Sequence, residues 1–294
     1  MSVSRFSLLH AGALASFSLA ALIVGCADDS SREAGAFPTF EEFRSQVHQD
    51  SEGTFTVDGD IAIHSEQELR EFYLEALDAY ESQVAAQGGV GVARDHLLVN
   101  RVGGADDLQP LSGRFDITYC VSSDFGTRFN TVVAELDDAA RSWSDILGVR
   151  YRRVDVSPCD TSTSVHFNVR PAPGGASYFA RAFFPGDPRS ERELLISDTA
   201  FTTTSGGRDF QGILRHELGH TLGFRHEHIV LVPQCTGETA EGYRAVTSYD
   251  VDSVMHYPQC RPSTGGGYRQ SYLDYSGGNL LYGLAPTLTQ AAAL

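Results

Sequence analysis

The feature that most constrains this chain is the segment of residues 216–226, which reads HELGHTLGFRH. His216 and His220 are four positions apart, so on a helix their side chains leave the same face one turn apart and can bind one ion. Gly223 can adopt the left-handed conformation that ends a helix. The chain can then turn and bring His226 back as a third ligand. The spacing therefore predicts a helix that carries a metal site at its end.

Three imidazole nitrogens with one open coordination position are typical of a catalytic zinc ion. Zinc lowers the pKa of a bound water to about 7 and polarises a carbonyl group. Glu217 lies beside the first histidine, where it can act as general base for that water and return the proton to a leaving amine. The alternative is an amphipathic helix with histidines on its surface. For three His, one Glu and one Gly at these offsets, a chance match is on the order of one in ten thousand.

Charge and composition exclude several classes of function. The net charge of −16 argues against a nucleic-acid partner, because the chain would repel phosphates. All 22 basic residues are arginine, which excludes a lysine Schiff base and a P-loop lysine. The hydrophobic share of 41% is enough for a core and argues against wholesale disorder.

The N-terminus has the pattern of a targeting segment. Residues 1–25 carry one positive charge before a mostly apolar run, as secretory signals do. The run ends in Ile-Val-Gly before Cys26, which resembles the bacterial lipobox, in which the cysteine is acylated and becomes the mature N-terminus. We therefore expect an exported, membrane-anchored lipoprotein with a polar tether over residues 26–36. An ordinary cleaved signal and an uncleaved anchor helix are the alternatives.

The remaining cysteines are expected to form two disulfides, because an exported protein folds in an oxidising compartment. Four cysteines allow three pairings. We expect Cys120 to pair with Cys159, since both end adjacent predicted parallel strands, and Cys235 to pair with Cys260, which would clamp the loop after His226. A cysteine-based zinc site would need a C-x-x-C spacing that the chain lacks.

Two folded bodies are predicted. Residues 37–87 hold two helical patterns around an extended piece that turns at Asp58-Gly59. Residues 88–112 are rich in glycine and predict a linker and possible cleavage region, with at most a short ordered piece at 96–99. Residues 113–294 begin with a strand–helix–strand pattern that predicts a right-handed parallel crossover. Strands are expected at 114–121, 149–156, 164–170, 178–184 and 193–197, and helices at 131–147, 209–223 and 270–281.

Two motifs resemble those of the metzincins. Residues 216–226 match H-E-x-x-H-x-x-G-x-x-H, and Ser-Val-Met-His-Tyr at 253–257 resembles the family's Met-turn. HELGHTLGFRHEH and SVMHYP together resemble the bacterial dual-action HEIGH metallopeptidases, relatives of the astacins, with Leu218 in place of isoleucine. The resemblance covers roughly residues 113–284. It implies an α+β metzincin-type catalytic domain, with a twisted mixed sheet, a backing helix, an active-site helix and a Met-turn, preceded by a small α/β pro-region.

The resemblance also implies a role for each matching residue. Zinc ligation falls to His216, His220 and His226, and Glu217 is general base and acid. Met255 forms an apolar floor under the metal. Tyr257 matches the astacin tyrosine that can ligate zinc and swing out to stabilise the oxyanion; the alternative is a packed tyrosine with a hydrogen-bonded hydroxyl.

Asp60 is a candidate latency ligand. Many astacins carry a pro-segment whose aspartate blocks the zinc in a motif like F-x-G-D. Here Phe55 lies two residues further from the Gly59-Asp60 pair than that motif requires. The alternative is an ordinary turn in which Asp60 is solvated.

These observations predict an exported Zn²⁺-dependent endopeptidase that is made as a zymogen and acts on protein or peptide substrates. Residues 176–186 resemble the metzincin edge strand that pairs with an extended substrate. Two alternatives remain open: a non-proteolytic zinc-binding lipoprotein, and a zinc amidase that acts on the cell wall.

Overall fold

The computed structural model describes residues 39–57, 59–74, 77, 97–203, 208–230, 242–258, 260 and 268–287. The signal segment, the tether, Asp58, Cys26 and Cys235 lie outside the described residues. Within the described part of the chain, no helix combines the length and the apolar composition that crossing a membrane requires.

The N-terminal body, residues 39–77, is a small sheet packed against helices. Helix α1 (Phe40–Gln46) begins at Thr39, whose hydroxyl accepts a hydrogen bond from the Glu42 N–H while the Glu42 carboxylate accepts one from the Thr39 N–H. Strands β1 (His48–Gln49), β2 (Phe55–Val57) and β3 (Ile61–Ile63) form an antiparallel sheet in that order, and residues 66–74 are helical. Its own small core consists of Phe40, Phe55, Val57, Ile61, Leu69 and Tyr73.

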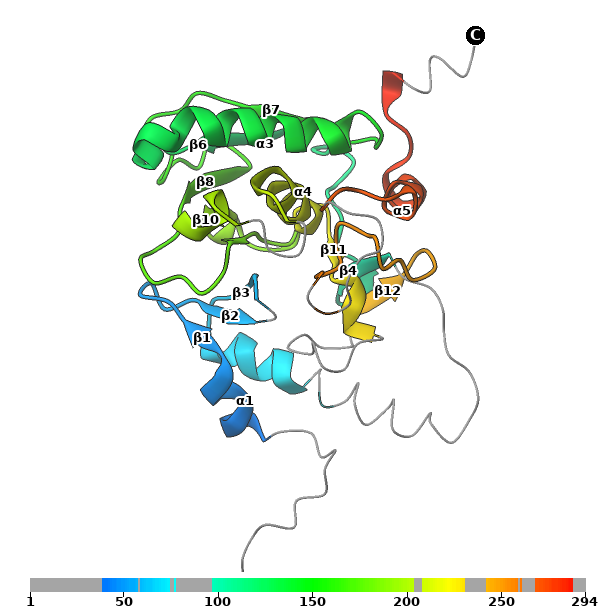
Figure 1. Cartoon of the computed structure of the whole chain (residues 1–294). Coiled ribbons are helices and arrows are strands. Elements are labelled where there is room, and N and C mark those ends of the chain that lie inside the picture. Colours follow the sequence, from blue (N-terminus) through cyan, green and yellow to red (C-terminus); the bar gives the residue numbers. More distant parts are fainter. Residues whose placement is uncertain are drawn as a thin grey trace, which may run out of the picture. The chain divides into compact units, whose positions relative to one another are not determined.

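The larger C-terminal body, called the catalytic body after the function that its sequence predicts, is built on a five-stranded mixed sheet with the order β7-β6-β8-β10-β9 (Figure 1). Its strands are β6 (Ile117–Val121), β7 (Tyr151–Arg153), β8 (Phe167–Pro171), β9 (Ala180–Arg181) and β10 (Glu193–Ile196). Four strands are parallel, and β9 runs antiparallel to β10 at one edge. Helix α3 (Phe129–Ser144) connects β6 to β7, as the predicted crossover requires.

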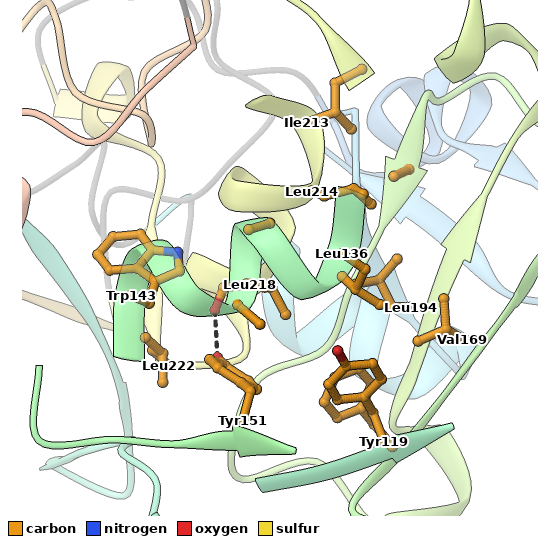
Figure 2. Packing of buried hydrophobic residues seen from close by; sticks show 14 of the residues in the cluster. Tyr119, Leu136, Trp143, Tyr151, Val169, Leu194, Ile213, Leu214, Leu218 and Leu222 are labelled. Carbon is orange, nitrogen blue, oxygen red and sulfur yellow. Dashed lines mark hydrogen bonds between the residues drawn. The ribbon is translucent and has the colours of Figure 1, made fainter. Parts of the chain in front are cut away.

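Helix α4 (Phe210–His220) is held in place by α3 and the sheet. Figure 2 shows Leu136 and Trp143 of α3 beside Leu214 and Leu218 of α4 in the buried core. The Trp143 indole N–H donates a hydrogen bond to the Arg215 carbonyl at 2.9 Å, and the Tyr151 hydroxyl donates one to the Leu218 carbonyl at 3.1 Å. The helix that carries the zinc motif is therefore anchored by side chains from two other elements.

A second, smaller sheet includes residues 98–106 of the segment 88–112 that was predicted to be a linker, and residues 88–96 lie outside the described residues. Strand β4 (Leu98–Val102) lies between β11 (Phe224–Arg225) and β12 (Tyr243–Ala245), and β5 (Ala105–Asp106) pairs with β4. Leu97, Leu98 and Val99 are fully buried. The local glycine content indicated a loop, but pairing with strands more than 120 residues away decides the conformation.

The remaining elements are short. Helix α5 (Tyr272–Tyr282) follows the Met-turn region, close to the predicted 270–281. Within the described residues, 3₁₀ helices lie at Ser123–Arg128, Arg189–Glu191, Asp198–Phe201 and Glu227–Val230. The strands in the structure are shorter than the predicted ranges, and β9 differs most. A strand extends only over residues that pair with a neighbouring strand. The α+β class is confirmed.

Candidate metal centre

The chain turn that returns His226 to the helix depends on Gly223. Helix α4 begins at Asp209, whose carboxylate accepts the Gly212 N–H at 2.7 Å. After the helix, Gly223 has a φ of 87° and donates its N–H to the His220 carbonyl at 2.8 Å. A Cβ at Gly223 would overlap the Asp107 carbonyl oxygen. Only glycine therefore permits this turn without strain.

The three histidines converge through their Nε2 atoms. The Nε2 of His216 lies 3.0 Å from that of His226 and 3.2 Å from that of His220. The Nδ1 atoms of His216 and His220 each lie 2.7 Å from a backbone carbonyl oxygen, that of Val254 and that of Phe224. A carbonyl can only accept, so each Nδ1 carries the proton and each Nε2 presents a lone pair.

This arrangement fits a bound cation. Burial lowers the pKa of His216 to about 4, so its ring is neutral at physiological pH. Two lone pairs 3.2 Å apart repel each other unless a positive ion lies between them. Neutral imidazole nitrogens are zinc ligands, and the backbone carbonyls that hold Nδ1 are the partners such ligands normally have.

Asp60 adds a carboxylate to the three histidines. Its Oδ2 lies 3.2 Å from the His216 Nε2, and its Oδ1 lies 3.2 Å from the His226 Nε2 and 3.6 Å from the His220 Nε2. The four ligand atoms all lie within 4.8 Å of one another, and all four residues are buried. Asp60 is thus not a solvated turn residue.

Tyr257 and Gly59 lie next to Asp60 in this cluster. The Tyr257 hydroxyl donates a hydrogen bond to Asp60, and its ring packs 4.4 Å from the His226 ring, centroid to centroid. Gly59 has a φ of 96°, and a Cβ there would lie 3.0 Å from the Tyr257 oxygen. The turn of the N-terminal body can approach the cluster closely because residue 59 has no side chain.

Glu217 is buried beside the cluster with one oxygen unused. It is 2% exposed, and its carboxylate accepts the Ala182 N–H, while Oε2 has no hydrogen-bond partner among the described residues. Burial, and next the charge of Asp60, raise the pKa of Glu217 well above its usual value. A cavity of about 150 Å³ is lined by Glu217, Asp60 and Tyr257, together with Ile213 and Tyr268.

The Met-turn is fixed by Asp274, a residue that the sequence analysis missed. The Asp274 carboxylate accepts hydrogen bonds from the Ser253 hydroxyl at 2.6 Å and the Val254 N–H at 2.9 Å. Met255 is fully buried against α4, where a Cβ at Gly219 would overlap its sulfur. Asp274 is also the third residue of α5 and completes a capping box there. The pattern Ser-x-x-Asp at 271–274 was the signal that could have found it.

The predicted cysteine pairing is confirmed for Cys120 and Cys159, which form a disulfide. Cys260 is also disulfide-bonded. Its expected partner Cys235 and the expected lipidation site Cys26 lie outside the described residues.

The sequence model of the Matrixin family, Peptidase M10, matches residues 112–255. A structure of myroilysin is similar with 17% identity and a TM-score of 0.44, covering 63% of this chain and 98% of that chain. High choriolytic enzyme 1, a hatching enzyme zinc-protease from the medaka fish Oryzias latipes, is similar with 18% identity and a TM-score of 0.38, covering 59% and 92%.

The Matrixin match runs from the start of the catalytic body to Met255, so it includes the central sheet, α4 and the three histidines. The α+β architecture described above has the layers of a metzincin catalytic domain. Over residues 112–255 the catalytic body is therefore similar to the Matrixin family of peptidases, and its fold is of the α+β class.

Proposed function

We propose that this chain is an exported zinc endopeptidase that hydrolyses peptide bonds with Glu217 as general base. One observation carries the proposal: the Nε2 atoms of His216, His220 and His226 converge beside the unused Glu217 oxygen. The three histidines would hold the metal ion. The dual-action HEIGH subfamily is the relationship that the motifs favour.

Each residue has a defined part in the reaction. A bound zinc ion supplies Lewis acidity toward a water molecule and a peptide carbonyl. Glu217 accepts the proton of the attacking water and passes it to the leaving amine. The Val254 and Phe224 carbonyls keep the imidazoles in one tautomer and orientation. The Tyr257 hydroxyl donates a hydrogen bond to the developing oxyanion once Asp60 has left.

The intact chain is proposed to be a latent zymogen. The Asp60 carboxylate lies among the three histidine Nε2 atoms, where the reacting water would otherwise bind. Export and lipid anchoring at Cys26 belong to the same proposal and rest on the sequence. An anchored N-terminus would keep the pro-region on the membrane if cleavage released the catalytic body.

The test compares wild type with Glu217→Gln and with a control, Glu135→Gln, a half-buried residue of α3. Glu217→Gln should bind about one equivalent of zinc, because all ligands survive, and should not hydrolyse casein. With the pro-region removed, or in the Asp60→Ala background, the control and the otherwise wild-type protein should hydrolyse casein until a chelator is added. Release of cell-wall fragments without casein cleavage would favour the amidase, and zinc binding without either activity would favour the non-proteolytic alternative.

A further inference from the structure

The residue that follows the edge strand β9 already forms a β-bridge with the N-terminal body. β9 is the last strand of the central sheet, so one of its edges is open within the catalytic body. On that side Ile61 of the N-terminal body forms a parallel bridge with Ala182, the residue after Arg181. The Ala182 N–H is also the group that donates to Glu217. An extended chain bound along β9 therefore passes Arg181 close to the general base.

Arg181 is a buried cation whose acidic partner comes from the N-terminal body. Its side chain is 4% exposed, and its Nη1 lies 3.2 Å from the Oδ2 of Asp50, which is 2% exposed. The same nitrogen lies 3.4 Å from the Thr56 hydroxyl. Among the described residues, no carboxylate of the catalytic body forms an ion pair with Arg181.

Arg170 shows the contrasting arrangement. It pairs with Glu52 of the N-terminal body at 2.5 Å, but also with Glu193 of its own sheet at 2.7 Å. Without the N-terminal body, Arg170 therefore keeps a carboxylate within ion-pair distance, whereas Arg181 keeps only the longer-range charge interaction with Glu217. A guanidinium left without a partner in a partly buried groove attracts an anionic group.

We propose that Arg181 is the specificity-determining residue of a subsite that takes an aspartate or glutamate side chain of an extended peptide substrate. The inference rests on the proposed peptidase function. Asp50 fills this subsite while the N-terminal body is in place. Strand addition supplies affinity through main-chain hydrogen bonds, and the pockets for alternate side chains supply selectivity. A carboxylate next to Arg181 on the added strand is a favourable cross-strand pair.

The first test is cleavage of a peptide library by the form of the protein that hydrolyses peptides, whether intact or processed. Wild type should favour an acidic residue at one position near the scissile bond, by about tenfold in kcat/KM over glutamine. Arg181→Gln should lose this preference, and Arg181→Glu should favour lysine or arginine there. Arg152→Gln is the control. Arg152 lies on β7, at the opposite edge of the sheet from β9, and forms an exposed ion pair with Asp116. No acidic preference, or one that survives Arg181→Gln, would overturn the proposal.

The second test needs no peptidase activity and uses the intact chain. Asp50→Ala empties the subsite, so sodium acetate should bind to Arg181 and raise the melting temperature by about 2 °C over sodium chloride at equal ionic strength. Wild type and the double variant Asp50→Ala/Arg181→Gln should show no such difference. An equal acetate effect in all three proteins would overturn the subsite. Failure of peptide hydrolysis with a positive acetate result would reject the peptidase proposal and keep the carboxylate site.

Discussion

Tyr257 donates a hydrogen bond to Asp60, although the two residues are 197 positions apart in the chain. One belongs to the Met-turn of the catalytic body and the other to the turn between β2 and β3. Both approach the same three histidines, and Gly59 gives the room for it. Because the hydroxyl is engaged by Asp60, the proposed oxyanion donor and the proposed water position are blocked by one carboxylate.

Replacing Asp60 should therefore activate the intact chain. Asp60→Ala should raise hydrolysis of a fluorogenic peptide at least about tenfold before any cleavage, because a tethered ligand acts at a high effective concentration. Zinc content should change little, since three histidines remain. The measurement is the initial rate of uncleaved protein, with chain integrity checked by mass spectrometry.

Asp58→Ala is the matched control, because it removes a carboxylate two residues away and should have little effect. Full activity of the uncleaved wild type would show that Asp60 does not impose latency. Gly59→Ala gives an independent check: a side chain at φ 96° and 3.0 Å from the Tyr257 oxygen should displace the turn and also raise activity.

The sequence predicted the histidine cluster well because its geometry is almost entirely local. His216 and His220 share a helical face, and Gly223 determines the turn that returns His226. A helix and one turn fix these positions before any distant residue is considered. The Cys120–Cys159 pairing followed from adjacent parallel strands in the same way.

Groups that reach the site from distant parts of the chain were harder to predict. Asp274 acts on the Met-turn from a helix that starts nearly 20 residues later. The local Ser-x-x-Asp pattern predicts its capping role, but its hydrogen bonds to the Met-turn depend on tertiary packing. The same holds for Arg181 and Asp50, which are 131 positions apart. The glycine-rich sequence around β4 predicts a linker, because the strands that pair with β4, β11 and β12, lie far along the chain.

Asp274 should contribute both to the stability of the fold and to the affinity for zinc. Asp274→Ala removes the acceptor of the Ser253 hydroxyl and the Val254 N–H, which should cost about 3 kcal/mol in the free energy of unfolding. The Val254 carbonyl would then hold His216 less firmly, and zinc affinity should fall about tenfold. Urea unfolding and competition with a chromophoric chelator measure the two effects.

The control for this variant is Asp155→Ala, which removes a carboxylate that is 87% exposed in its pair with Arg153. It should change stability by less than about 1 kcal/mol. Unchanged zinc affinity in Asp274→Ala would show that the Met-turn holds its position without this carboxylate.

Asp187 should make the fold less stable as the pH rises. Burial raises the pKa of Asp187 from 3.8 to about 7, although its carboxylate accepts the Phe184 N–H at 2.8 Å. The folded chain therefore holds the proton more tightly than the unfolded chain. The resulting stabilisation is complete below about pH 4 and is lost as the pH rises through 7.

Asp187→Asn keeps the acceptor and removes the titration. Between pH 4 and pH 8 its free energy of unfolding should fall about 2 kcal/mol less than that of wild type, allowing for screening of a half-buried group. Urea unfolding at several pH values makes this comparison. Parallel curves for both proteins would mean that Asp187 titrates normally.

Cys26 should determine whether the protein is associated with the membrane. Cys26→Ser removes the thiol that would be acylated, and several acyl chains each contribute about 0.8 kcal/mol per buried methylene to membrane binding. The variant should move from the membrane to the soluble fraction, or accumulate with its signal uncleaved. Normal processing with unchanged membrane partition would exclude the lipoprotein proposal.

Tyr257 should act both on latency and on the reaction. In the intact chain, Tyr257→Phe removes the hydrogen bond that holds Asp60, so latency should weaken and Asp60→Ala should raise peptide hydrolysis by a smaller factor in this variant than in wild type. In the Asp60→Ala background the hydroxyl is released, and Tyr257→Phe should lower kcat about a hundredfold with little change in KM, because the lost hydrogen bond forms only in the transition state. A purely structural tyrosine would leave the activation factor of Asp60→Ala unchanged and would act through stability, and thermal melting of all four proteins separates that outcome. An unchanged kcat in the Asp60→Ala background would remove Tyr257 from the reaction and leave it as a residue that positions the latency carboxylate.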